Sequence, residues 1–176
     1  MSNANDPELT QAPARKALGQ HFLFDPNILH RAATAAGSPA GRTVIEVGPG
    51  PGGLTRAILK EGATKLIAVE ADPRFAAALL DWPEAKDSRL VVIEKDARKV
   101  RWEKVLEELG AETPAMIIAN LPYNVGTVLL IDWLKAGACA VGVGGALLDK
   151  QAIADGNFAK LTENARILRQ SIQSVR

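Results

Sequence analysis

The stretch that decides the fold is Thr43-Val-Ile-Glu-Val-Gly-Pro-Gly-Pro-Gly-Gly-Leu-Thr55. It opens with a β-branched run, residues 43–47, that predicts a short strand. The turn that follows has glycine at positions 48, 50, 52 and 53, and glycine allows a tight turn and a close approach of the backbone to a ligand. The next residues, 54–61, predict a helix that ends at Gly62.

The alternation of strand and helix continues along the chain. Asp25-Pro26 and Asp72-Pro73 each predict a helix start, because aspartate can cap a helix and proline suits its first turn. Further strands are expected over residues 65–69, 90–93 and 115–119, and further helices over residues 75–80, 102–109 and 125–135. The strands are short and apolar on both faces, as in a parallel sheet covered by helices. We therefore expect a doubly wound α/β domain with right-handed crossovers.

Composition sets limits on the function. The chain has 176 residues, of which 47% are hydrophobic and 23% charged, and this is typical of a globular domain. The net charge of +1 argues against a nucleic-acid clamp that acts by bulk charge, although a local basic patch remains possible. Cys139 is the only cysteine, which excludes an internal disulfide and a Cys-rich zinc site, and no metal-ligand spacing is present. With no apolar run of about 18 residues and no signal-peptide pattern, a cytoplasmic protein without membrane contact is expected.

Three segments are expected along the chain. Residues 1–14 are polar and predict a loose arm, and residues 15–150 hold the α/β domain. Within that domain, residues 138–148 predict a poor fifth strand. Residues 151–176 predict a helical tail with an apolar stripe of Leu161, Ala165, Leu168, Ile172 and Val175.

The glycine turn fits two ligand motifs, the dinucleotide pattern G-x-G-x-x-G and the acid-x-G-x-G-x-G pattern of S-adenosylmethionine-dependent methyltransferases. The acids favour the second motif. Glu46, Glu70 and Asp96 stand at or just after the ends of successive strands, and ligands of such sheets bind at these ends. Carboxylates repel a pyrophosphate and attract an ammonium or sulfonium group. Pro51 also removes a backbone N–H from the turn.

The spacing assigns roles to two of these acids. Glu70 follows Gly52 by 18 residues, which is the spacing at which an acid reaches ribose hydroxyls. Asp96 would then accept a hydrogen bond from the adenine amine. The alternative interpretation is a purely structural glycine turn, with acids that cap helices or face water.

The expected fourth strand ends in Asn120-Leu121-Pro122-Tyr123. The side-chain oxygen of Asn120 and the backbone carbonyl of Leu121 or Pro122 can each accept a hydrogen bond from an exocyclic amine. Tyr123 offers a face on which a base can stack. Catalysis here would rest on proximity and orientation. The alternative is an ordinary turn with a half-buried tyrosine.

Five motifs resemble those of the ribosomal RNA adenine dimethyltransferases: Gly19-Gln-His-Phe-Leu23, Glu46-Val-Gly-Pro-Gly50, Val69-Glu-Ala71, Asp96 and Asn120-Leu-Pro-Tyr-Asn124. The resemblance covers about residues 15–137 and is strongest to the bacterial members, which dimethylate two adjacent adenines in small-subunit ribosomal RNA. It implies a class I methyltransferase fold, S-adenosylmethionine as cofactor, and ribosomal RNA or the ribosomal subunit as partner. It implies nothing about oligomeric state.

The resemblance also implies roles for individual residues. The cofactor-binding positions would be His21, Leu23, Glu46, Gly48, Gly50, Glu70, Asp96 and Asn120. The catalytic turn would be formed by Asn120, Leu121, Pro122 and Tyr123, with Tyr123 stacked on a flipped base. After Gly137 the sequence departs from the family, and the last strands, a second aromatic residue and a small helical domain are not found. Two alternatives therefore stay open: a shortened, weakly active or inactive RNA-binding or ribosome-binding domain, and an NAD(P)-dependent reductase.

Overall fold

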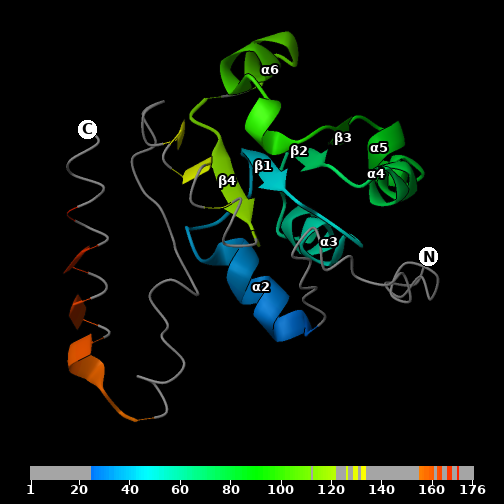
Figure 1. The fold of residues 1–176 in the computed structure, drawn as a ribbon. Coiled ribbons are helices and arrows are strands. Elements are labelled where there is room, and N and C mark those ends of the chain that lie inside the picture. Colours follow the sequence, from blue (N-terminus) through cyan, green and yellow to red (C-terminus); the bar gives the residue numbers. More distant parts are fainter. Residues whose placement is uncertain are drawn as a thin grey trace. The chain divides into compact units, whose positions relative to one another are not determined.

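The computed structural model describes residues 25–111 and 113–121, together with single residues and short runs within 126–133 and 155–170. The chain forms two compact units, residues 1–125 and 126–176. The first unit contains a four-stranded sheet in the order β3-β2-β1-β4 (Figure 1). All neighbouring strands are parallel. The sheet is made of β1 (Thr43–Val47), β2 (Lys65–Glu70), β3 (Leu90–Glu94) and β4 (Met116–Ala119). The expected parallel α/β fold is confirmed.

The helices of this unit are α2 (Pro26–Thr34), α3 (Gly53–Lys60), α4 (Pro73–Leu80), α5 (Pro83–Lys86) and α6 (Trp102–Glu108), with a 3-10 turn η2 (Ala97–Lys99). Both predicted aspartate caps are confirmed. The carboxylate of Asp25 accepts hydrogen bonds from the backbone N–H groups of Asn27 and Ile28, and that of Asp72 accepts one from Arg74. The short elements α5 and η2 were not predicted, because each is only about one turn long and has no periodicity to reveal it.

The strand order places the helices in two layers. The chain passes from β1 through α3 to β2, and then through α4 to β3, moving in one direction across the sheet. It then returns through α6 to β4 on the other side of β1. Right-handed crossovers therefore put α3 and α4 on one face and α6 on the opposite face, as Figure 1 shows.

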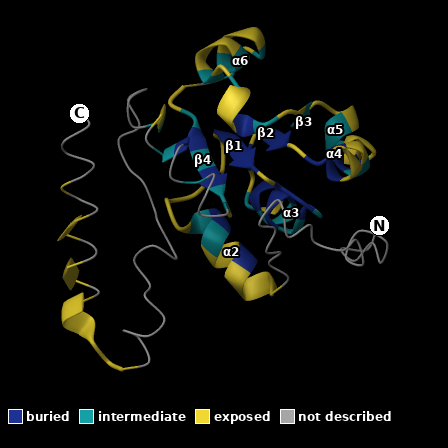
Figure 2. Ribbon diagram, viewed as in Figure 1, coloured by how far each residue is buried: buried dark blue, intermediate teal, exposed yellow. Residues whose placement is uncertain are grey.

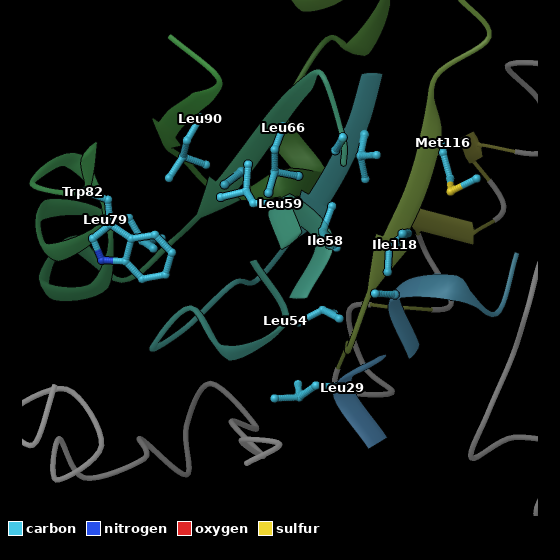
Figure 3. Packing of buried hydrophobic residues seen from close by; sticks show 14 residues of the cluster. Leu29, Leu54, Ile58, Leu59, Leu66, Leu79, Trp82, Leu90, Met116 and Ile118 are labelled. Carbon is cyan, nitrogen blue, oxygen red and sulfur yellow. The ribbon is translucent and has the colours of Figure 1, made fainter. Parts of the chain in front are cut away.

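The main hydrophobic core lies between the sheet and the layer that holds α2, α3 and α4 (Figures 2 and 3). Its members come from every strand, and they include Leu29, Val44, Ile58, Leu66, Leu79, Trp82, Leu90, Met116 and Ile118. On α2 the buried residues are Leu29 and Ala33. Ala32 packs partly buried against the core, and Ile28 is 49% exposed because it lies outside the side of α2 that meets the core.

In the second unit, the described residues between positions 126 and 133 are helical, within the helix predicted over 125–135. The described residues 158–160, 162–163, 166–167 and 170 are also helical, and all of them are exposed. The tail stripe (Leu161, Ala165, Leu168, Ile172, Val175) and the expected strand over 138–148 lie outside the described residues. Among the helices that are described, none is both long enough and apolar enough to span a membrane.

Candidate cofactor site and reaction turn

The glycine turn after β1 needs glycine for its backbone conformation. Gly48, Gly50 and Gly52 have φ angles of 70°, 55° and 86°, in the left-handed region that other residues rarely adopt. The N–H of Gly48 donates to the carbonyl of Val69 at 2.9 Å, and this bond ties the start of the turn to β2. The N–H of Gly52 donates to the carbonyl of Pro49 at 3.0 Å and closes the turn. The turn is thus held at the carboxyl edge of the sheet, where ligands of this architecture bind.

Trp82 packs against the glycine turn at Gly52. A Cβ atom at Gly52 would lie 2.6 Å from Cη2 of Trp82, so no side chain fits between them. The indole is 9% exposed and belongs to the main core. The guanidinium of Arg56 covers it at 4.1 Å from the ring centroid, which is a cation–π contact. Glycine is required at position 52 by this packing as well as by its φ angle.

Glu70 ties the middle of the turn to β2. One carboxylate oxygen, Oε2, accepts the N–H of Gly50 at 2.9 Å, and the other, Oε1, accepts the N–H of Asp72 at 2.8 Å. Burial raises the pKa of Glu70, and these backbone hydrogen bonds oppose the increase. A carboxylate oxygen can accept more than one hydrogen bond. Glu70 can therefore hold the turn and still accept hydrogen bonds from the hydroxyl groups of a ligand.

Glu46 lies on the same side of the sheet as Glu70, because it pairs with Ala68 and side chains alternate along a strand. It is 1% exposed, and among the described residues neither of its oxygens has a hydrogen-bond partner. Burial raises the pKa of Glu46 to about 8, and the charge of Glu70 raises this pKa further. The nearby Thr55 hydroxyl lowers the pKa, although its oxygen is not in hydrogen-bonding geometry with the carboxyl group. Three charged carboxylates were expected at this edge, but the Glu46 carboxyl is largely neutral at pH 7.

Asp96 follows β3 and caps η2. Its Oδ1 accepts the backbone N–H of Arg98 at 3.0 Å, and its Oδ2 pairs with Nη2 of Arg98 at 2.6 Å. The hydrogen bonds from Arg98 lower the pKa of Asp96, so the side chain is ionised at neutral pH. Asp96 thus acts as a cap, as the alternative interpretation expected, and its carboxylate also remains 27% exposed. An adenine amine would reach it beside Arg98.

The turn after β4 lies beside the glycine turn. β4 pairs with β1, with Ala119 opposite Val47, so the two strands end at the same edge. A Cβ atom at Gly48 would lie 3.9 Å from Cδ2 of Leu121. Asn120 is exposed at this edge. The structure therefore places Leu121 against the glycine turn, with Asn120 at the same edge of the sheet.

The remaining predicted site residues, His21, Leu23, Pro122 and Tyr123, lie outside the described residues. Three residues that contact the site were not predicted as parts of it: Thr55, Trp82 and Arg98. Thr55 had a weak signal, as a polar residue two positions after the last glycine of the turn. Within the described part of the chain, no group of three or more His, Cys, Asp or Glu residues could hold a metal ion.

The parallel sheet, the glycine turn and the strand-end acids define a class I methyltransferase fold. The structural comparison agrees: the crystal structure of a dimethyladenosine transferase from Plasmodium falciparum superposes with a TM-score of 0.50 at 28% identity, over 68% of this chain and 40% of that one. The sequence model of the ribosomal RNA adenine dimethylases matches residues 11–154. The chain belongs to this family.

Curated relatives agree with this membership. The chain is 55% identical over 121 residues to the ribosomal RNA small subunit methyltransferase A of Sinorhizobium fredii, a match that covers 69% of this chain and 39% of the relative. It is 56% identical over 121 residues to the protein of the same name from Rhizobium etli, with 69% and 42% covered. The match thus spans about two fifths of each relative's length.

Proposed function

We propose that this chain binds S-adenosylmethionine at the glycine turn and transfers methyl groups to the N6 amines of two adjacent adenines in small-subunit ribosomal RNA. The observation that carries the proposal is the contact between two turns. The glycine turn, held by Glu70, lies against Leu121 of the turn that follows β4. A ligand on the first turn and an amine on the second would be neighbours. Family membership supplies the reaction, and we place the activity in the cytoplasm.

The acids provide the hydrogen-bond acceptors that such a cofactor needs. Glu70 would accept hydrogen bonds from the ribose hydroxyls. Asp96 would accept a hydrogen bond from the adenine amine on the exposed side of its carboxylate. Glu46 would face the positively charged amino-acid part. Gly48 and Gly50 would let the backbone approach the ligand, and His21 and Leu23 would contact it from the N-terminal segment.

The reaction turn would position the target amine. Asn120 would accept one hydrogen bond through its side-chain oxygen, and the carbonyl of Leu121 or Pro122 would accept another. The nitrogen lone pair would then point at the methyl group, and Tyr123 would stack on the extruded base. The cofactor supplies an electrophilic methyl group. The chain contributes proximity and orientation, and the amine proton leaves to water after transfer.

The acids argue against the reductase alternative. A dinucleotide pyrophosphate would be placed next to the carboxyls of Glu46 and Glu70, which lie close enough for Glu70 to raise the pKa of Glu46. Glu70 also holds the N–H of Gly50, one of the few donors that this turn could offer to a phosphate. The turn therefore offers few donors to a phosphate and holds the Glu70 carboxyl next to it, and this suits a cation with hydroxyl groups.

Calorimetric titration of the whole chain tests the cofactor. We expect S-adenosylhomocysteine to bind and NADH not to bind. Replacement of Asp96 by Ala should weaken binding at least tenfold, because one charge-assisted hydrogen bond contributes about 1.5–3 kcal/mol. Replacement of Arg98 by Ala is the matched control: it removes the partner of Asp96 and leaves the carboxylate for the ligand, so affinity should hold or rise.

Methyl transfer to undermethylated small ribosomal subunits tests the reaction. Incorporation of labelled methyl groups into adenine, dependent on Asn120, would support the full proposal. Cofactor binding without any transfer would favour the alternative of a domain that binds ribosomal RNA but does not modify it. A folded chain that binds NADH instead would overturn the proposal.

A further inference from the structure

The least explained group at the site is the buried pair formed by Glu46 on β1 and Thr55 in the first turn of α3. Glu46 is 1% exposed and Thr55 is 0% exposed. Neither the carboxyl oxygens nor the hydroxyl has a hydrogen-bond partner within the described part of the chain. A buried carboxylate without donors is costly, and the usual response of the group is to take up a proton.

The surroundings of Glu46 offer its negative charge no support. From β2 the facing ionisable group is Glu70, which is itself an acid, and from α3 the facing polar group is Thr55. From β4 the neighbour across the strand pair is Ile118. Among the described residues no cation acts on the carboxyl. The described residues therefore supply no charge that would stabilise ionised Glu46, and a cationic ligand would supply one.

We propose that Glu46 carries a proton in the free protein and releases it to solvent when the cationic cofactor binds. The inference rests on the proposed function, since it requires a ligand with a positive charge. The O–H bond of the acid breaks, the proton passes to water, and the carboxylate is left to pair with the ligand's ammonium group. No oxidant or reductant is involved.

The exchange makes affinity depend on pH. The free-state pKa of Glu46 is about 8, so below that pH binding must expel a proton. Affinity then rises about tenfold for each pH unit up to about pH 8. Above that pH the rise ends, because Glu46 is already ionised and the ligand's α-amino group, whose pKa is also about 8, loses its charge.

Titration calorimetry with S-adenosylhomocysteine measures the released proton directly. We would titrate the whole chain at pH 6.5 in two buffers of different ionisation enthalpy. An α-amino group, with a pKa of about 8, is already charged at that pH and contributes little to the proton count. We expect about one proton released by the wild type and none by Glu46→Gln. Methylthioadenosine, which lacks the amino-acid part, should bind without proton release.

A pH series from about 6 to about 8 tests the coupling through affinity. The affinity of the wild type should rise about tenfold for each pH unit, and that of Glu46→Gln should not. An equal pH dependence of the two proteins would overturn the coupling.

The outcomes separate this inference from the function on which it rests. One proton released by the wild type, and none by Glu46→Gln, supports the coupling. Tight binding with the same binding enthalpy in both buffers, and with an affinity that does not depend on pH, would overturn the coupling and leave the proposed function in place. Absence of S-adenosylhomocysteine binding by the folded chain would overturn both.

Discussion

Replacement of Glu46 by Gln should reverse the way in which the stability of this protein depends on pH. The pKa of Glu46 is raised by burial from 4.5 to about 8 in the folded chain. Between these values the folded state holds a proton that the unfolded state has lost, so the free energy of unfolding falls as pH rises. One pKa unit corresponds to about 1.4 kcal/mol, which gives a total loss of roughly 5 kcal/mol between pH 4.5 and pH 8.

The Gln variant cannot titrate at this position. Its amide keeps the shape of the carboxylic acid but leaves a buried NH2 group without a partner, at a cost of about 1–3 kcal/mol. We therefore expect the variant to be less stable than the wild type at pH 5. By pH 8 the wild type has lost more than this cost, so the order should invert, with the variant more stable by roughly 2 kcal/mol.

Urea unfolding followed by circular dichroism at half-unit steps from pH 5 to pH 8 measures both curves. The difference between the curves isolates Glu46 from all other titrating groups. Glu94→Gln is the matched control, because Glu94 also ends a strand but is exposed, and its difference should stay within about 0.5 kcal/mol. A Glu46→Gln difference that is constant across the pH range would refute the reasoning, since it would mean that Glu46 is ionised in the folded chain.

Four further outcomes follow from the packing and the turns. Gly52→Ala should weaken S-adenosylhomocysteine binding at least tenfold in titration calorimetry, because its Cβ would lie 2.6 Å from Trp82 and force the turn to move; unchanged affinity would mean that the turn does not bind the ligand. Phe75→Ala should cost about 3–5 kcal/mol in chemical unfolding, because Phe75 is 0% exposed. Phe158→Ala, at a position 73% exposed, should cost less than about 0.5 kcal/mol. Asn120→Ala should lower the methyl-transfer rate at saturating cofactor by about 100-fold while the fold is kept; an unchanged rate would remove Asn120 from the proposed chemistry.

The strands and the sheet were predictable because their signals are local and repeated. The first strand was predicted over residues 43–47, and β1 spans the same residues. The predicted aspartate caps at Asp25 and Asp72 form, since capping depends only on the next two or three residues. Parallel strands end at one edge, so the motifs at the strand ends were expected at the same edge; the contact of Leu121 with the glycine turn also requires β4 to pair with β1, which the sequence did not predict.

The protonation of Glu46 was not predictable in the same way. The sequence identifies an acid at a strand end, and it was counted as a negative charge. Its actual state depends on the surrounding strands and α3, which exclude water and supply no described donor. The ion pair between Asp96 and Arg98 could have been predicted from the sequence, because the two residues are only two positions apart. The role of Trp82 was not, because its contact with Gly52 spans 30 residues and depends on where α4 ends.

The contacts of the glycine turn show where the cofactor site is built. The turn follows β1, yet the groups that hold it lie later in the chain, on β2 and just before α5: Val69 accepts from Gly48, Glu70 accepts from Gly50, and Trp82 packs against Gly52. Left-handed glycines would otherwise sample many conformations, so each of these contacts removes freedom that a ligand would have to remove on binding. The segment from Val69 to Trp82 therefore contributes to affinity by holding the turn, in addition to the direct contact proposed for Glu70. Substitutions in this segment should therefore change cofactor affinity more than they change the rate of methyl transfer, which depends on the reaction turn that follows β4.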